Sequence, residues 1–307
     1  LGDIGRSPRM QYHSLCLSRH FDHVDLVGSS GEPPLSSVSS NPRITIHYIS
    51  AFPRLPDLPR LPRAIFFLLM YAPSKVLVQS LRLFIAFVYS SRPSSHILVQ
   101  NPPSIPTLAI AWAAARLCGS RLVVDWHNLG HSLLAMSAGG SGRHLVRFAT
   151  AFERLFGARL ADSHISVTQA MARHIREWGP VSPEVGIAVL RDRPHSGNFR
   201  PFSQVESGEF LRSFVSNRIA SGATGTEKRI LEIVAAEAGK GILQRTVAIL
   251  GSSTSWTHDE DVGVLLDGLV SIDAVQAGRG LLVVLTGKGD ERGAFLAGIA
   301  ASELRTV

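Results

Sequence analysis

The sequence HILVQNPPSIPTLAIAWAAARLCGSRLVVDWHN, residues 96–128, contains the pattern that decides the fold. An apolar run at 96–100 is followed by a proline-rich turn, a long stretch with helical character, and a second apolar run at 121–125. Short apolar runs that alternate with helical stretches are typical of a parallel sheet whose two faces are covered by helices. We therefore predict an α/β fold built from strand–helix–strand units.

The same alternation continues outward from this unit in both directions. Further strands are predicted at 23–28, 44–49, 164–168, 186–190, 246–250 and 281–286. Between the last two strands, residues 261–272 are expected to form a helix. At 195–245 the alternation gives way to a polar segment rich in serine and glycine, which is typical of a boundary or an insertion. We predict a Rossmann-like domain at 1–194, a linker or variable insertion at 195–245, and the start of a second Rossmann-like domain at 246–307.

Positive charge is concentrated in the first half of the chain. The formal net charge is +7, and residues 1–150 hold 14 Lys and Arg against 6 Asp and Glu. Such an excess suggests a polyanionic partner, which can be nucleic acid, an anionic membrane or a phosphorylated substrate. The two cysteines lack the spacing of a disulfide framework or a zinc site. The apolar stretch 64–89 is interrupted by Pro73, Lys75 and Arg82, so we expect it to contact a membrane only peripherally.

Two glycines and two arginines precede a predicted helix in GDIGRSPRM, residues 2–10. Ser7 stands where a helix N-cap is expected, and Pro8 stands at the first helical position. Free backbone N–H groups and the positive end of the helix dipole favour an anion there, and glycine lets the backbone approach it. A tight turn with solvated arginines is the structural alternative. The predicted anion-binding residues are Gly2, Gly5, Arg6 and Arg9.

Two more loops follow predicted strands, at the sheet edge where open α/β folds bind their ligands. In the first loop, Asn101 is placed to hydrogen-bond a sugar hydroxyl, although a plain capping turn explains the pattern equally well. In the second loop, DWHN at 125–128, Trp126 offers a face for a sugar ring. His127 carries an imidazole, the side chain best suited to accept a proton near neutral pH. A structural role for His127 is the alternative.

Loops of the same kind follow the predicted strands of the last part of the chain. GSSTSWT at 251–257 brings hydroxyl and N–H groups together, as a nucleotide diphosphate requires. TGKGD at 286–290 sets Lys288 between two glycines, which suits a phosphate contact. The acidic residues 259–261 are typical of metal ligands or of a first helical turn, and we favour the helical interpretation. Neither a P-loop nor the glycine fingerprint of a dinucleotide-dependent oxidoreductase is found in the sequence.

These motifs together resemble those of the eukaryotic chitobiosyldiphosphodolichol β-mannosyltransferases. Five motifs occur in the family's order and approximate spacing: GDIGRSPRM, QNPPSIPT, DWHN, SSTSWT with DED, and TGKG. The chain departs from the family at Leu129, His131 and Asp290, which puts local substrate and phosphate contacts in doubt. The resemblance implies a GT-B fold with two Rossmann-like domains, the second of them incomplete here. It also implies an anchor before Leu1 and donor-binding segments beyond Val307, so we expect this stretch alone to be inactive.

The resemblance further implies an inverting enzyme at the cytosolic face of the endoplasmic reticulum membrane. Such an enzyme moves mannose from GDP-mannose to dolichyl-diphosphate chitobiose, with a β-1,4 linkage, during assembly of the N-glycan precursor. Other mannosyltransferases that act on lipid-linked oligosaccharides are further expected partners, and nucleic acid is not. We expect no cofactor, assign no metal ligands, and leave dependence on Mg²⁺ open. A non-catalytic, membrane-associated scaffold of the same fold is the alternative function.

The resemblance and the residues together indicate a role for each candidate. His127 is the expected general base, assisted or replaced by Asp125, with Asp3 as a further alternative. Arg6 and Arg9 would hold the acceptor's diphosphate or stabilise negative charge in the transition state. The remaining expected acceptor contacts are Gly2, Gly5, Asn101, Trp126 and Asn128. The expected contacts to the donor's phosphates are Ser252, Ser253, Thr254 and Lys288.

Overall fold

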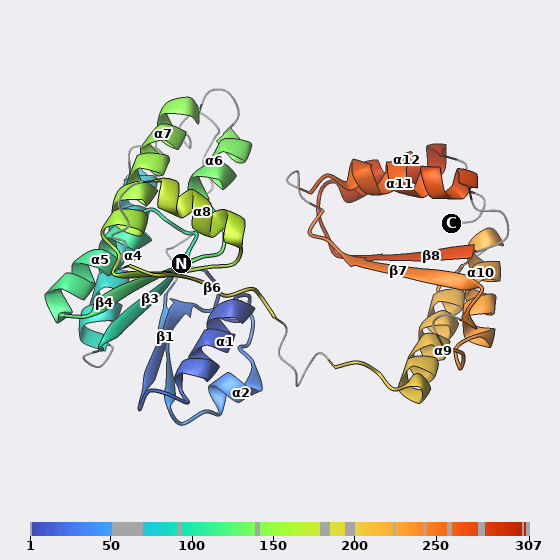
Figure 1. Ribbon diagram of the computed structural model, residues 1–307, viewed down its shortest axis with the longest axis horizontal. Coiled ribbons are helices and arrows are strands. Elements are labelled where there is room, and N and C mark those ends of the chain that lie inside the picture. Colours follow the sequence, from blue (N-terminus) through green and yellow to red (C-terminus); the bar gives the residue numbers. More distant parts are fainter. Residues whose placement is uncertain are drawn as a thin grey trace. The chain divides into compact units, whose positions relative to one another are not determined.

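The computed structural model consists of two compact units, Leu1–His195 and Ser196–Val307 (Figure 1). The structure describes residues 2–50, 70–90, 94–138, 142–178, 185–193, 200–223, 225–241, 244–256, 260–275, 280–302 and 304. The two units are described separately.

All strands of the first unit are parallel to their neighbours. The strands are β1 (Val24–Ser29), β2 (Ile44–Ile49), β3 (His96–Asn101), β4 (Arg121–Trp126), β5 (Ser163–Ser166) and β6 (Ile187–Val189). β1 pairs with β2, and the other four form a sheet in the order β3-β4-β5-β6. Parallel pairing requires a crossover between neighbouring strands, and helices supply it here. The predicted α/β fold is therefore confirmed.

Helices connect these strands (Figure 1). They are α1 (Pro8–Leu17), α2 (Ser36–Ser39), α4 (Ala72–Ile85), α5 (Thr107–Cys118), α6 (Gly130–Ala138), α7 (Arg143–Phe152) and α8 (Gln169–Glu177), with π-helical segments η2 (Ala86–Ser90) and η4 (Glu153–Arg159). The largest apolar core joins α5 to β4: Leu108 and Ala111 pack with Leu122 and Val124, and all four are fully buried. Alanines on α5 allow this close approach, and the helix ends at Gly119, whose φ of 68° is left-handed.

Helix α1 begins at Pro8 as predicted. The sequence marks one face of this helix by the spacing of Met10, Ser14, Leu17 and Phe21. Of these residues, Ser14 is buried and Met10 packs on an apolar cluster, whereas Phe21 lies beyond the end of the helix and is exposed. The helix also buries Arg9 and Gln11, whose side chains bind a carboxylate and backbone groups of neighbouring segments. Ser7 does not cap the helix, and its hydroxyl instead donates a hydrogen bond to Gln100 Oε1 at 3.1 Å.

The second unit has helices on both faces of a parallel strand pair (Figure 1). Its elements are α9 (Gln204–Ala220), α10 (Gly225–Ala236), β7 (Val247–Ser253), α11 (Val262–Val275), β8 (Gly280–Thr286) and α12 (Arg292–Ala301). Leu282 packs with α9 and α10, whereas Leu281 packs with α11 and α12. Successive residues of a strand face opposite sides, which explains this division.

The polar segment at 195–245 contains helices α9 and α10. Ser203 and Glu206 form a capping box at the start of α9, in which each side chain accepts from the other residue's backbone N–H. Leu211 and Leu231, from α9 and α10, pack in one apolar cluster with Val247 of β7. This stretch therefore contributes core residues to the second unit. The division of the chain at 194 and 245 stays a prediction.

A buried histidine makes the stability of the first unit depend on pH. His164 of β5 is 1% exposed, and burial lowers its pKa from 6.5 to about 4. In the unfolded chain the imidazole takes up a proton near pH 6.5, whereas in the folded protein it stays neutral down to about pH 4. The stabilising effect is complete above pH 6.5 and is lost as the pH falls toward 4.

We predict that His164→Leu removes about 3 kcal/mol of pH-dependent stability between these two pH values. Urea unfolding of the parent and the variant, followed by tryptophan fluorescence across this range, measures the difference. The parent should lose stability relative to the variant as the pH falls. If the difference in unfolding free energy between parent and variant stays constant with pH, His164 takes up a proton in the folded protein as readily as in the unfolded chain.

Candidate functional site

The loops that follow β3 and β4 meet at one edge of the four-stranded sheet. The backbone N–H groups of His127 and Asn128 both donate to the carbonyl oxygen of Asn101, at 3.0 and 3.2 Å. Because neighbouring parallel strands end at the same edge, these loops come together as predicted. The amino-terminal end of α1 joins them through the hydrogen bond from Ser7 to Gln100.

Arg9 and Asp125 form a buried, two-pronged ion pair at this edge. Arg9 Nε lies 2.6 Å from Asp125 Oδ2, and Arg9 Nη2 lies 2.7 Å from Oδ1. The Asp125 side chain is fully buried, and His13 Nε2 lies 2.9 Å from its Oδ2. Burial alone would raise the pKa of Asp125, but hydrogen bonds from His13 and Arg9 outweigh that effect and hold the pKa below its ordinary value. Asp125 is therefore a carboxylate with both oxygens engaged.

This ion pair changes the roles that the sequence indicates for both residues. Arg9 directs its remaining nitrogen, Nη1, to Asp192 Oδ1 at 2.6 Å and to the carbonyl oxygen of Leu190 at 3.1 Å. Its guanidinium thus binds groups of the protein itself, whereas the sequence predicts that it binds the acceptor's diphosphate. Asp125 holds Arg9, where the sequence predicts a base or a helper of the base.

Trp126 also lies inside the protein. Its side chain is fully buried, and its ring packs edge-on against Trp178 with centroids 5.8 Å apart. Gly157 of η4 lies beneath this ring, so that any side chain at position 157 would press on the indole. The indole therefore fills the core, where the sequence predicts a stacking surface for a sugar.

His127 is exposed at the same edge, beside a carboxylate that the sequence analysis missed. The His127 side chain is 42% exposed, and its Nδ1 lies 3.4 Å from Oδ2 of Asp192. Asp192 follows β6 closely, in the sequence RDRP at 191–194. An acidic residue just beyond a predicted strand was the signal available in the sequence, because such residues reach the ligand-binding edge.

A second buried carboxylate, Glu153, ties the loops after β3 and β4 together. Its Oε1 accepts from the Asn101 amide at 2.9 Å and from the backbone N–H of Gly130 at 2.8 Å, and its Oε2 lies 2.6 Å from His131 Nδ1. The Ser104 hydroxyl also donates to it. Burial would raise the pKa of Glu153, but these hydrogen bonds outweigh it and lower the pKa. Asn101 is fully buried, so its amide orders the loop, where the sequence predicts a contact to a sugar.

The first loop, residues 2–6, is ordered by Asp3. One carboxylate oxygen of Asp3 accepts from the N–H of Gly5 at 3.0 Å, and the other accepts from the N–H of Glu32 at 2.9 Å. A side chain at Gly5 would collide with the backbone of Glu32, which explains the glycine. Gly2 and Arg6 of this loop are exposed. Asn128, in the loop after β4, is exposed as well.

In the second unit, the predicted donor loop folds around an acidic side chain of the chain itself. The carboxylate of Glu260 accepts from the Thr254 hydroxyl and from the backbone N–H groups of Ser255 and Trp256, at 3.0 and 3.1 Å. Asp261 Oδ1 accepts from the N–H of Gly263 at the start of α11, which agrees with the helical interpretation of the acidic residues. The loop therefore presents a converging set of donors to an anionic group.

The loop after β8 packs directly against this donor loop. The N–H of Thr254 donates to the carbonyl oxygen of Thr286 at 3.1 Å. Gly287 has a φ of 114°, which strains any other residue, and a side chain at Gly289 would collide with the backbone of Ser255. The glycines thus permit close packing of two loops and leave Lys288 exposed between them. Ser252 and Ser253 are exposed at the end of β7.

Within the described ranges, no group of three or more His, Cys, Asp or Glu side chains is placed to hold a metal ion. Residues 5–191 match the family described as glycosyl transferase 4-like domain. The chain belongs to that family. This match covers most of the first unit, including Arg9, Asp125, His127 and Glu153.

Proteins with established names are similar to the chain over most of its length. It is 34% identical to the chitobiosyldiphosphodolichol beta-mannosyltransferase of Dictyostelium discoideum, over 95% of this chain and 63% of the relative. It is 35% identical to the protein of the same name from Yarrowia lipolytica, over 100% and 60%. A protein of Arabidopsis thaliana named UDP-glycosyltransferase TURAN is 33% identical over 100% of this chain and 70% of its own length. The chain spans about three fifths of the first two relatives, and the resemblance seen in the motifs is confirmed.

Proposed function

We propose that the protein is an inverting glycosyltransferase that moves mannose from GDP-mannose to dolichyl-diphosphate chitobiose. The product carries a β-1,4 linkage and belongs to the assembly of the N-glycan precursor. The observation that carries this proposal is the match of nearly the whole chain to relatives named chitobiosyldiphosphodolichol beta-mannosyltransferase. An exposed imidazole at the ligand-binding edge of the first unit supports it.

Inversion at the anomeric carbon calls for a single displacement with a general base. The acceptor's hydroxyl oxygen attacks that carbon, the bond to the oxygen of GDP breaks, and the hydroxyl proton passes to the base. Among the three candidates, Asp3 and Asp125 have both carboxylate oxygens engaged within the protein. His127 is the exposed candidate, and its Nε2 is the atom that we assign to the proton.

We assign the phosphates of the two substrates to the exposed donors of the loops. Arg6 and Gly2 are exposed next to the amino-terminal end of α1, where an anion is favoured, whereas the N–H of Gly5 already donates to Asp3. The donors around Glu260 already bind a carboxylate, and the same arrangement suits the diphosphate of GDP. Lys288, Ser252 and Ser253 are exposed at that end of the strand pair. Glu260 would have to move aside for the donor to use the Thr254 hydroxyl.

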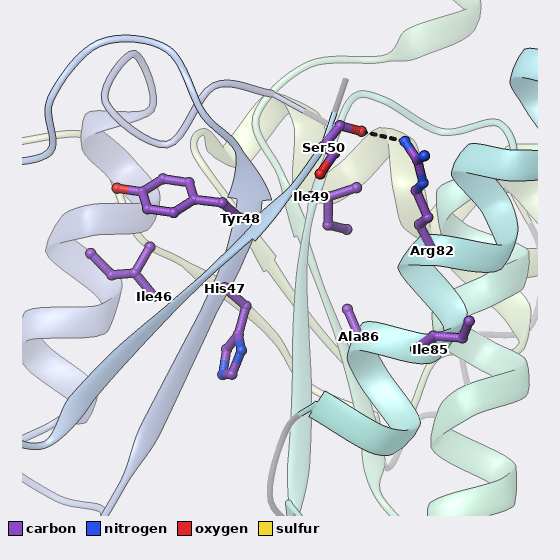
Figure 2. A pocket seen from close by; sticks show the side chains of 8 residues that line it. All are labelled: Ile46, His47, Tyr48, Ile49, Ser50, Arg82, Ile85 and Ala86. Carbon is purple, nitrogen blue, oxygen red and sulfur yellow. Dashed lines mark hydrogen bonds between the residues drawn. The ribbon is translucent and has the colours of Figure 1, made fainter. Parts of the chain in front are cut away.

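We further propose that α4 and η2 rest on the surface of the endoplasmic reticulum membrane, where the lipid acceptor is presented. The inner face of this helical segment packs on β2 through Ile49, Leu83 and Ala86. Figure 2 shows Arg82, which donates to the Ser50 carbonyl oxygen at 2.8 Å. The opposite face exposes apolar side chains at helical spacing. They are Met70, Leu77, Leu81 and Tyr89.

An exposed apolar stripe beside cations is typical of a helix that lies in the membrane interface. Lys75 is exposed on the same helix. Phe66, Phe67 and Leu69, which the sequence also suggests for this surface, lie outside the described residues, as do Arg60 and Arg63. No helix among the described residues is long and apolar enough to cross a membrane.

The function is tested by transfer of radiolabelled mannose from GDP-mannose to a short-chain lipid-diphosphate chitobiose. For this assay the chain is extended with the residues of the Dictyostelium relative that lie outside the match. His127→Ala should slow transfer by about 10²- to 10⁴-fold, because the acceptor loses its base. His144→Ala, which removes an exposed histidine of α7, should leave the rate unchanged.

Three results would contradict this proposal. Transfer from a UDP-sugar in place of GDP-mannose would favour the activity suggested by the name of the Arabidopsis relative. No transfer from either donor would favour the scaffold alternative. A rate for His127→Ala within a few-fold of the parent would remove His127 as the base.

The membrane surface is tested by binding to vesicles of phosphatidylcholine and phosphatidylserine. Leu77→Ser combined with Leu81→Ser should weaken binding by about tenfold or more, since each buried leucine contributes about 1.5–3 kcal/mol. Val264→Ser, which removes an exposed apolar side chain of α11 in the second unit, is the matched control. Equal vesicle binding by all three proteins would rule out this surface.

A further inference from the structure

We infer that Asp192 is a positioning residue for His127, one that sets the ring orientation and the tautomer of the base. This inference deepens the proposed function and rests on it, because it takes His127 as the group that accepts the acceptor's proton. The carboxylate of Asp192 lies between two functional groups: Oδ1 accepts from Arg9 Nη1 at 2.6 Å, and Oδ2 lies 3.4 Å from His127 Nδ1.

Asp192 is held in place by Arg9. Its side chain is 52% exposed, and an isolated carboxylate with that exposure would sample many orientations. Arg9 prevents this, because its guanidinium is itself held at two nitrogens by the buried Asp125. Arg9 Nη1 also bonds the carbonyl oxygen of Leu190, which fixes the backbone two residues before Asp192. Asp192 is therefore an exposed carboxylate that the buried pair of Arg9 and Asp125 holds in place.

The carboxylate of Asp192 sets the tautomer of the His127 imidazole. A carboxylate beside Nδ1 favours the tautomer with the proton on Nδ1, so that the lone pair of Nε2 points away from Asp192. The same negative charge stabilises the imidazolium that forms once Nε2 has taken the acceptor's proton. Asp125 is only two positions from His127 in the sequence but does not serve this purpose, since its oxygens are held by Arg9 and His13.

The contacts of Arg9 and Asp192 join distant segments of the chain. Arg9 belongs to α1, Asp125 and His127 belong to β4 and the loop after it, and Asp192 follows β6. From the buried sheet edge to the surface, basic and acidic side chains alternate in the order His13, Asp125, Arg9, Asp192 and His127. A buried ion pair therefore sets the position of an exposed acid–base pair.

The tautomer is measured directly in the 307-residue protein labelled with ¹⁵N-histidine. Two-bond ¹H–¹⁵N spectra show which ring nitrogen carries the proton, and His127→Ala identifies the His127 signals. In the parent, neutral His127 should carry its proton on Nδ1. Asp192→Asn should move protons onto Nε2, whereas Asp22→Asn, at another exposed carboxylate of the first unit, should leave the pattern unchanged. This readout does not depend on mannosyl transfer.

The effect on catalysis is measured in the completed protein with GDP-mannose and the lipid acceptor. Asp192→Asn should lower kcat by about tenfold to a hundredfold and leave both KM values within about twofold, because the base is misoriented while binding is kept. Asp192→Glu, which restores the charge, should recover part of the loss. A parent that transfers no mannose contradicts the proposed function. An unchanged tautomer, or an unchanged kcat in an active parent, overturns the role of Asp192.

Discussion

The buried ion pair between Arg9 and Asp125 is the interaction on which the candidate site depends. Removing both charges from water is costly, and it is offset only when the geometry is good and the remaining hydrogen-bonding atoms are satisfied. Both conditions are met here: two short parallel bonds join the side chains, and His13, Asp192 and the Leu190 carbonyl oxygen satisfy the rest. Because the partners come from α1, β4 and the segment after β6, one pair of charges holds three distant parts of the chain together.

The carboxylates of this edge divide into those that hold structure and those that face solvent. Asp3 and Glu153 accept hydrogen bonds from loop atoms, and Asp125 accepts them from Arg9 of α1. The pKa values of the two buried groups, Asp125 and Glu153, are lowered, so that both are carboxylates that bind groups of the protein. His127 and Asp192 are exposed at this edge, and the proposed function rests on them.

Much of the fold follows from short-range patterns in the sequence. The bounds of β2 are as predicted, and those of β3 and β4 differ by one residue, because apolar runs end at turn-forming residues there. The positions of the loops are also as predicted, since parallel strands place their following loops at one edge. The buried face of α1 was predicted only in part, because spacing marks Met10 and Ser14 but cannot reveal that the helix also buries Arg9 against a charged partner.

What sequence reasoning could not reach is the pairing of distant polar residues. Arg9 and Asp125 are separated by 116 positions, and Arg9 and Asp192 by 183. Nothing in local spacing distinguishes an arginine that binds a substrate from one that binds an inner carboxylate. Glu153 was missed for the same reason, since it lies in a helical stretch where an acidic residue is ordinarily solvated.

A double-mutant cycle on Arg9 and Asp125 tests the central claim most directly. Arg9→Met, Asp125→Leu and the combination are compared with the parent by urea unfolding near neutral pH. Each single change leaves an unpaired buried charge and should cost about 3–5 kcal/mol. The double change should cost no more than either single one, which gives a coupling energy of about 3 kcal/mol. Costs that simply add would show that the two side chains stabilise the protein independently, and would contradict this account.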